Sequence, residues 1–295
     1  MTMQAQLEQF TTGRGFIAAL DQSGGSTPKA LENYGIGADR YVDEQQMIDL
    51  IHAMRTRIIT SPEFDNSRII GAILFEGTME SSIEGMLTAD FLWERKRIIP
   101  FLKIDVGLEM ETDGISLMKP IPQIDTRLQH ASQRNIFGTK MRSVIHDAIP
   151  DSVAAVVDQQ FELASRIRDH GLVPIVEPEV AIDSPRKAEC EDLLRTALVR
   201  HLDTLEEGRE VALKLTLPEQ DGLYDELVMH PNTIRVTALS GGYARDEACR
   251  RLARNRGMVA SFSRALAEDL SESMSDAEFD LTLGRSIVAI HTASV

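Results

Sequence analysis

The chain has 295 residues, a hydrophobic fraction of 43% and a formal net charge of −15. This length could hold one large domain or two ordinary ones, and the composition is sufficient for a well-buried core. The acidic balance argues against nucleic acid or an anionic membrane surface as a partner, because both attract basic proteins. No segment approaches the ~20 apolar residues of a membrane span, and the N-terminus lacks the apolar stretch of a secretory signal. Cys190 and Cys249, the two cysteines, have neither redox nor metal-site spacing, so we expect a soluble cytoplasmic protein.

Eight short apolar runs of strand length recur along the chain, and each is followed by a helix-like or turn-rich stretch. They cover residues 15–20, 69–75, 98–104, 136–141, 172–176, 211–217, 233–239 and 258–262. Amphipathic helical periodicity is found between and after them, at residues 43–59, 152–170, 243–256 and 276–289. The runs lack polar alternation, which indicates strands buried on both faces, as in a parallel sheet covered by helices.

Eight such β-then-α units in one chain predict a (β/α)8 TIM barrel rather than an open doubly wound sheet. Residues 1–10 are polar and helix-prone and predict a short N-terminal helix, and residues 276–289 predict an extra C-terminal helix. No Gly/Ser-rich linker or change of composition divides the chain. We therefore expect a single barrel domain over residues 1–295.

Polar and charged residues follow most of the predicted strands, at the end where barrel enzymes carry their working residues. They are Asp21, Glu76, Lys103, Asp105, Lys140, Arg142, Glu177, Glu179, Lys214, Ser240, Gly241, Gly242, Ser263 and Arg264. Each one alone could be a strand-end residue that meets solvent, but their convergence on one rim is harder to explain in that way. The cations predict an anionic substrate, and the mixture with carboxylates predicts acid–base chemistry on it.

Lys214 lies near the centre of the apolar run 211–217, although lysine is rarely buried. A buried lysine is either part of an ion pair or a partly neutral amine nucleophile, and this segment alone favours the ion pair. In a barrel mouth, desolvation and the positive fields of Lys140 and Arg142 favour the neutral amine, which can form a Schiff base with a ketone. Metal-stabilised enolate chemistry is the rival, but none of the seven histidines lies at a predicted strand end. We therefore expect neither a metal site nor a cofactor.

The turn formed by Ser240, Gly241 and Gly242 could offer backbone N–H groups to a phosphate, although a Gly-Gly pair is more often only a turn. Ser263 and Arg264 strengthen the phosphate interpretation, because arginine suits phosphate bidentately.

The segment 21–29 brings an acid, three hydroxyls, two glycines and a lysine onto one turn. This turn could bind a phosphate in a similar way. Ser26 or Thr27 could equally serve as the N-cap of a helix that starts at Pro28, and both interpretations can hold together.

Seven segments, in order along nearly the whole chain, resemble class I fructose-bisphosphate aldolase in its bacterial branch. They are residues 19–29, 100–105, 138–142, 173–179 (VPIVEPE), 213–215, 239–242 (LSGG) and 261–264. The resemblance implies reversible, metal-independent cleavage of fructose 1,6-bisphosphate to dihydroxyacetone phosphate and glyceraldehyde 3-phosphate in glycolysis and gluconeogenesis. The family's habit of forming tetramers suggests a homo-oligomer, although the sequence does not locate an interface.

By this resemblance, Lys214 matches the Schiff-base lysine, and Glu177 matches the acid/base of imine formation, with Glu179 beside it. Asp21 matches the carboxylate that takes the proton from the hydroxyl at the bond that breaks, and Lys140 matches the cation that assists the carbinolamine step. The phosphate-binding positions implied are Ser240, Gly241 and Arg264, with Gly242 and Ser263 beside them, and further substrate contacts are implied at Ser23, Ser26, Lys103 and Arg142.

Two positions depart from the animal-type pattern, which has Glu where this chain has Gln22 and Lys where it has Val106. Both departures could alter affinity for the second phosphate, and the mobile tyrosine tail of the animal type has no counterpart in residues 291–295. Two alternatives stay open at this point: another lysine Schiff-base barrel of the transaldolase or deoxyribose-phosphate aldolase kind, or a non-catalytic sugar-phosphate-binding scaffold.

Overall fold

The computed structural model describes residues 2–295 and contains a closed barrel of eight parallel strands. The strands are β1 (Phe16–Leu20), β2 (Ile69–Leu74), β5 (Ile99–Lys103), β7 (Gly138–Ile145), β8 (Val173–Val180), β9 (Val211–Thr216), β10 (Thr233–Leu239) and β11 (Met258–Phe262). They follow the order β5-β2-β1-β11-β10-β9-β8-β7, and a parallel pairing of β5 with β7 closes the ring. All eight predicted strands and the (β/α)8 fold are therefore confirmed.

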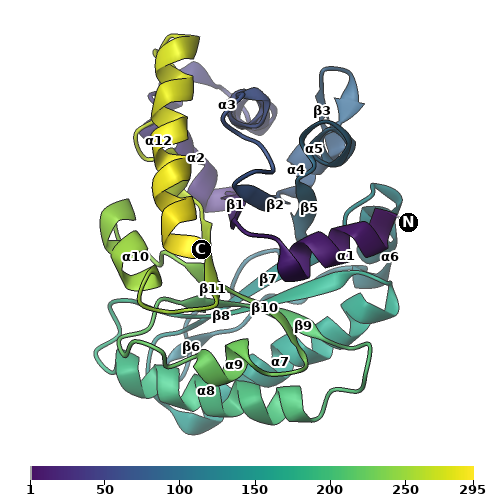
Figure 1. Ribbon diagram of the computed structural model, residues 1–295, viewed down its shortest axis with the longest axis vertical. Helices are drawn as coiled ribbons and strands as arrows, with labels where there is room; N and C mark the ends of the chain where they lie inside the picture. The colour runs from purple at the N-terminus through teal and green to yellow at the C-terminus, as the bar shows by residue number, and fades with distance from the viewer. Residues whose placement is uncertain (1) are drawn as a thin grey trace.

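Helices surround the barrel, with α7, α8 and α9 along one side and α3, α5 and α12 on the other (Figure 1). Their bounds are α1 (Thr2–Thr12), α2 (Thr27–Asn33), α3 (Glu44–Thr60), α4 (Glu76–Glu80), α5 (Thr88–Lys96), α6 (Ile124–Gln133), α7 (Pro150–Asp169), α8 (Lys187–Asp203), α9 (Asp225–Val228), α10 (Arg245–Leu252), α11 (Arg264–Ala267) and α12 (Asp276–Ser294). Short 3-10 turns lie at Gly24–Ser26 and Ala38–Arg40. The predicted N-terminal and C-terminal helices are α1 and α12.

Strands β7 and β8 each extend four residues beyond their predicted ends. Their parallel register continues from Gly138↔Val173 to Ile145↔Val180, and the short strand β6 (Ile115–Ser116) pairs antiparallel with the end of β7. Polar side chains in this stretch concealed the continuation, because they point into the barrel mouth rather than mark a loop. Three predicted site residues therefore lie within strands and not after them, namely Arg142, Glu177 and Glu179.

The longer β7 also corrects the expectation that no histidine lies at a strand end. His146 follows β7 directly, and its Nε2 lies 3.2 Å from the Ser116 hydroxyl. It does not line the cavity described below. A small antiparallel hairpin of β3 (Ser82–Ile83) and β4 (Met86–Leu87) is a further element that the sequence patterns did not indicate.

Helix α1 closes the N-terminal end of the barrel. Its Phe10 ring is fully buried, with its centroid 5.0 Å from that of Phe101 and 5.8 Å from that of Phe137. Arg235 on β10 donates from Nε to the Phe10 carbonyl at 2.5 Å. Because this end is filled by apolar side chains, a ligand can reach the barrel interior from the C-terminal ends of the strands.

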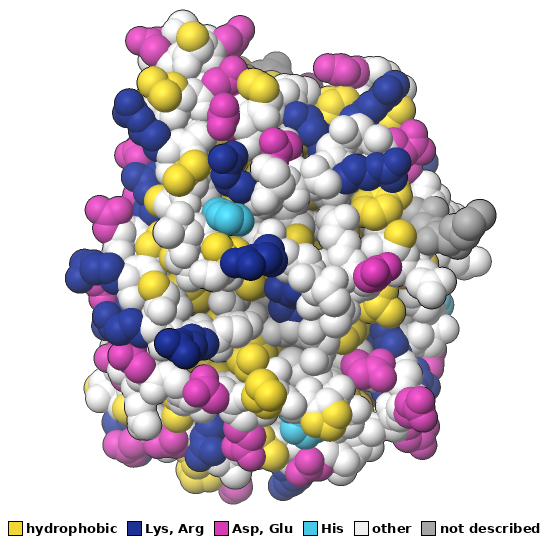
Figure 2. Space-filling model, viewed as in Figure 1, with side chains coloured by type: hydrophobic (Ala, Val, Ile, Leu, Met, Phe, Trp, Pro, Cys, Tyr) yellow, Lys and Arg dark blue, Asp and Glu magenta, His cyan; other side chains and the backbone are white. Residues whose placement is uncertain are grey.

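The surface carries acidic and basic side chains in close mixture, and acidic ones are frequent around α7–α9 at the lower edge of the view in Figure 2. Within residues 2–295, no helix combines the length and the apolar character that crossing a membrane requires.

Candidate active site

A cavity of about 1100 Å³ lies at the C-terminal ends of the barrel strands. Every predicted site residue except Gly242 lines it, namely Asp21, Ser23, Ser26, Lys103, Lys140, Arg142, Glu177, Glu179, Lys214, Ser240, Gly241, Ser263 and Arg264. Gly242 lies just beside it, since a Cβ built on this glycine would be 3.6 Å from Arg264 Nη2. The fold therefore brings together residues that are up to 243 positions apart in the sequence.

Lys140 is the centre of a buried ion-pair network. Its Nζ lies 2.9 Å from Asp21 Oδ2, 3.0 Å from Glu177 Oε2 and 3.8 Å from Asp105 Oδ2. Burial alone lowers the pKa of Lys140, but the charges of Asp21, Glu177 and Asp105 outweigh it and hold that pKa above its ordinary value. Lys140 is therefore a permanent cation of the site.

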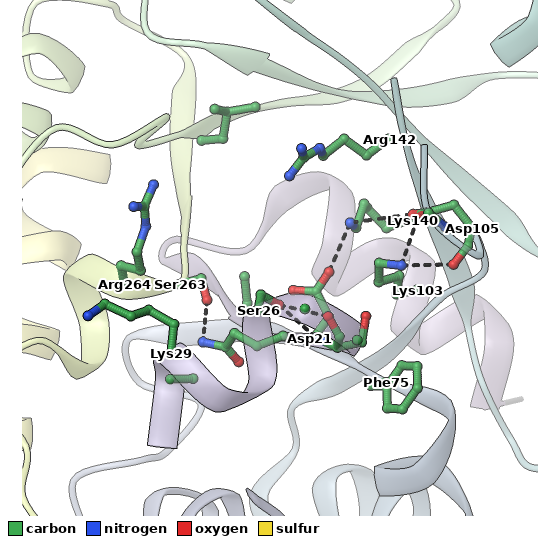
Figure 3. A pocket seen from close by; sticks show the side chains of 18 of the residues that line it. Asp21, Ser26, Lys29, Phe75, Lys103, Asp105, Lys140, Arg142, Ser263 and Arg264 are labelled. Atoms are coloured by element: carbon green, nitrogen blue, oxygen red, sulfur yellow. Dashed lines mark hydrogen bonds and ion pairs between the residues drawn. The ribbon is translucent and has the colours of Figure 1, made fainter. Parts of the chain in front are cut away.

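Asp21 follows β1 and points toward Lys140 (Figure 3). Burial acts to raise the pKa of this carboxyl, yet the charge of Lys140, followed by those of Lys214 and Lys103, holds the pKa well below its ordinary value. Asp21 is consequently ionised at neutral pH and can accept a proton.

Lys214 lies on β9 and contacts the second oxygen of the Glu177 carboxylate, with 2.9 Å between Nζ and Oε1. Glu177 thus stands between the two ammonium groups of Lys214 and Lys140. The sequence led us to expect both cations and a carboxylate around Lys214, and the charged group in direct contact with it is the Glu177 carboxylate. The backbone of Glu177 is fixed from behind, because its N–H donates to the buried amide oxygen of Gln160 at 2.9 Å.

Arg142 and Glu179 form a second layer of charge toward the mouth. They are two residues beyond Lys140 and Glu177 on the same strands, so the period of two puts them on the same face. Arg142 Nε lies 3.2 Å from Glu179 Oε2. Burial raises the pKa of Glu179, and the charge of Arg142 offsets this only in part.

The other part of the cavity is formed by the turns after β10 and β11. Gly241 and Gly242 have φ values of +61° and +126°, and a Cβ on Gly241 would lie 2.6 Å from Ile182 Cγ2, so this close turn requires glycine. Within residues 2–295, Arg264 has no carboxylate partner within 4.0 Å. Figure 3 shows Arg264, Ser263 and Lys29 on the same side of the cavity.

The turn after β1 is closed by two serines. The Ser26 hydroxyl donates to the Ser23 carbonyl at 2.9 Å and accepts from the Ser23 N–H at 2.9 Å. Ser26 occupies the N-cap position of α2, with Pro28 in the first turn, but its side chain bonds to Ser23 and not to the N–H groups of the helix. Lys29 pairs with Glu32 on the surface, with 2.8 Å between Nζ and Oε2.

Two further arginines belong to the site and were not predicted. Arg55 on α3 is 1% exposed, and burial lowers its pKa to about 10 even though Asp21 lies near enough to oppose the shift. Its position on the apolar face of a helix, four residues after Ile51, was a signal available in the sequence. Arg127 lines the cavity from α6 and pairs with Glu76 at 3.4 Å, and nothing in the sequence pattern indicated this.

A family model and two known proteins with similar sequences all point to the same protein family. The family model described as fructose-bisphosphate aldolase class-I matches residues 3–218. The chain is 55% identical to the class 1 fructose-bisphosphate aldolase of Synechocystis sp., over 99% of this chain and 97% of that protein. It is 52% identical to that of Porphyromonas gingivalis, over 98% of each.

Among solved structures, the fructose-bisphosphate aldolase of Plasmodium falciparum matches with a TM-score of 0.80 at 20% identity, over 99% of this chain and 93% of that one, which shows the shared barrel fold. Within residues 2–295, no group of three or more His, Cys, Asp or Glu side chains is arranged to hold a metal ion. The chain belongs to the class I fructose-bisphosphate aldolases, the metal-independent lyases that cleave fructose 1,6-bisphosphate through a Schiff base.

Proposed function

We propose that Lys214 is the amine that forms the Schiff base and that Glu177 moves the protons of this step. The observation that carries the proposal is the position of the Glu177 carboxylate, 2.9 Å from Lys214 Nζ and 3.0 Å from Lys140 Nζ inside the cavity. An ammonium must lose a proton before it can attack a carbonyl, and a carboxylate in hydrogen-bond reach is the direct acceptor.

In this proposal, the Lys214 amine adds to the ketone carbon of fructose 1,6-bisphosphate and forms a carbinolamine. Lys140 donates a hydrogen bond to its oxygen, and Glu177 returns the proton to the hydroxyl, which leaves as water. Asp21 then takes the proton of the hydroxyl on C4 as the C3–C4 bond breaks. The bonding electrons pass into the protonated imine, an enamine forms on Lys214, and glyceraldehyde 3-phosphate departs.

Protonation of the enamine and hydrolysis of the resulting imine release dihydroxyacetone phosphate and restore the Lys214 amine. Glu179, which pairs with Arg142, is a second carboxyl group near Glu177 during these proton transfers.

We propose that the two phosphates bind on opposite sides of Lys214. Ser240, Gly241, Gly242, Ser263 and Arg264 hold the phosphate of the dihydroxyacetone half, and Ser23, Ser26, Lys103 and Arg142 contact the other half. The charge of Arg264 supports the first assignment, because it is not neutralised by a neighbouring carboxylate within residues 2–295 and so remains available to a dianion.

Borohydride reduction in the presence of dihydroxyacetone phosphate, followed by peptide mapping, tests the assignment of the lysine. We expect one secondary amine, on the peptide that contains Lys214. Label on Lys140 or Lys103, with Lys214 unmodified, would contradict the proposal.

We further propose that residues 1–295 form one catalytic barrel domain, which the pairing of the first barrel strand with the last supports. We propose that the protein acts in the cytoplasm, which the role of the reaction in glycolysis supports, and that its partners are sugar phosphates rather than nucleic acid.

We also propose that the protein associates into a homo-oligomer. Exposed apolar side chains at seven-residue spacing support self-association; they are Leu281 and Val288 on α12 and Val295 directly after it. Light scattering of the purified protein measures the oligomeric state.

A further inference from the structure

A hydrogen bond between Gln22 and Ser263 joins the two turns that carry the proposed proton acceptor and the proposed phosphate cation. Gln22 directly follows Asp21, and Ser263 directly precedes Arg264. Gln22 Nε2 donates to the Ser263 hydroxyl oxygen at 2.5 Å, and both side chains are half-buried in the wall of the cavity (Figure 3). Ser263 and Arg264 lie on the same side of the cavity (Figure 3), so the bond holds a hydroxyl group on the side where Arg264 lies.

Gln22 is also held from behind by a buried charge. Arg55 Nη2 donates to the Gln22 carbonyl at 2.5 Å, and Arg55 Nη1 donates to the Thr78 hydroxyl at 2.7 Å. Arg55 is 1% exposed, so water does not compete for these bonds. Through Arg55, the backbone of Gln22 is held in place relative to α3 and α4. This fixes the position from which the Gln22 side chain reaches Ser263.

The direction of this bond decides what the serine can do. A serine hydroxyl has one proton to donate, and an amide NH2 group cannot accept it. While Gln22 donates to its oxygen, the Ser263 hydroxyl keeps its proton for another acceptor, and the neighbouring Arg264 attracts anions to the same place. We infer that Gln22 is a positioning residue that orients the Ser263 hydroxyl as a donor to the phosphate held at Arg264, and so raises affinity for phosphorylated ketoses. The inference rests on the proposed phosphate role of this end of the cavity.

A carboxylate at position 22 has the opposite effect. It only accepts hydrogen bonds, so it takes the proton of Ser263 away from the phosphate, and it adds a negative charge beside a dianion. The substitution Gln22→Glu therefore tests the direction of the bond, whereas Gln22→Met removes the bond at similar side-chain length.

The experiment compares dihydroxyacetone phosphate with dihydroxyacetone, two ketones that differ only in the phosphate. Calorimetry gives the affinity for the phosphorylated ketone, and the rate of borohydride trapping on Lys214 is measured with each. We expect Ser263→Ala and Gln22→Met each to weaken dihydroxyacetone phosphate about tenfold and to leave trapping with dihydroxyacetone within about twofold. Gln22→Glu should weaken it further. Gln45→Met, on the exposed side of α3, is the matched control and should change neither.

The double variant Gln22→Met/Ser263→Ala separates positioning from direct contact. If Gln22 acts through Ser263, the double variant is no weaker than Ser263→Ala alone. Losses that multiply to about a hundredfold would mean that Gln22 touches the phosphate itself, and an equal loss with both ketones would mean a general structural role; either result overturns the inference. An unchanged affinity in Ser263→Ala also overturns it. Failure of the proposed function is recognised separately, as label on a lysine other than Lys214 in the unsubstituted protein.

Discussion

Two buried lysine–glutamate pairs, Lys214–Glu177 in the barrel mouth and Lys187–Glu191 on helix α8, have nearly the same local chemistry and different surroundings. In both pairs the ammonium directly contacts the carboxylate, and each side chain is no more than 6% exposed. Only the first pair lines the cavity.

The two lysines differ in the number of protein groups that contact the side-chain nitrogen. Lys187 Nζ contacts Glu191, donates to the Leu217 carbonyl at 2.9 Å and lies 3.2 Å from Glu219, so its three protons have protein partners. Lys214 Nζ has one carboxylate neighbour within 4.0 Å among residues 2–295, and its side chain lines the cavity. Burial and pairing therefore do not by themselves distinguish the two lysines; the incomplete set of partners beside a cavity is the property of Lys214 on which its proposed role rests.

Methionine at each lysine gives the largest expected contrast. Lys214→Met should abolish both cleavage and borohydride trapping while the fold is kept, because an apolar side chain of similar length is readily buried. Lys187→Met should keep trapping on Lys214 but lose roughly 3–5 kcal/mol of unfolding free energy, because it leaves Glu191 buried without its cation. Mass spectrometry of the reduced complex and urea unfolding measure the two effects. Borohydride trapping that persists in Lys214→Met would show that another lysine forms the Schiff base.

Glutamine in place of each glutamate is the next contrast. Glu177→Gln should slow imine formation by about 10²–10⁴, because proton transfer to the leaving hydroxyl is lost, while Lys214 still becomes labelled after long incubation. Glu191→Gln should leave the rate within about twofold. Single-turnover trapping rates measure both, and equal rates in the two variants would remove Glu177 from proton transfer.

The burial of Lys214 could be predicted from the sequence, whereas the burial of Lys187 could not. Lys214 interrupts an apolar strand, so its burial is visible in the pattern. Lys187 begins a segment with several charges that reads as an exposed helix start, and it is buried only because residues 217–219 fold over it. The barrel itself was predictable from eight apolar runs, because strand burial leaves a local signature.

Contacts between distant residues left no such signature. The hydrogen bond between Gln22 and Ser263 joins residues 241 positions apart. The position of Glu177 between Lys140 and Lys214 depends on the register of β7 with β8, in which Arg142 is paired with Glu177. The ends of these two strands were missed for a related reason, since polar residues that face a cavity look like loop residues in one dimension.

Arg264 has fewer partners than either lysine, because no carboxylate lies within 4.0 Å of it among residues 2–295. Arg264→Ala should weaken both dihydroxyacetone phosphate and fructose 1,6-bisphosphate by about ten- to a hundredfold, since a charge-assisted contact is worth roughly 1.5–3 kcal/mol. Arg254→Ala, which removes an exposed arginine paired with Asp221, is the matched control and should leave both affinities unchanged. Calorimetric titration measures them, and an unaltered affinity for dihydroxyacetone phosphate in Arg264→Ala would take this arginine out of the site.

The smallest expected effect is the contribution of the Lys187–Glu191 pair to the pH dependence of stability. Burial raises the pKa of Glu191 above its ordinary value of 4.5, and the Glu219 N–H and the charge of Lys187 offset this only in part. A carboxyl with a raised pKa in the folded state contributes stability that is fully present below its unfolded pKa and is lost as pH rises through the folded value. The unfolding free energy of the unsubstituted protein minus that of Glu191→Gln should therefore be greatest near pH 4 and fall toward pH 7.

The fall amounts to about 1.4 kcal/mol for each unit by which the folded and unfolded pKa values differ. Urea unfolding of both proteins across this range measures it, and Glu207→Gln, at an exposed site between α8 and β9, is the control that should give a flat difference. A difference that instead grows with pH would show that Lys187 holds Glu191 ionised in the fold. The Lys187–Glu191 pair would then resemble the proposed catalytic pair, Lys214–Glu177, in charge state as well as in geometry, and the two pairs would differ in the partners of the lysine and in whether they line the cavity.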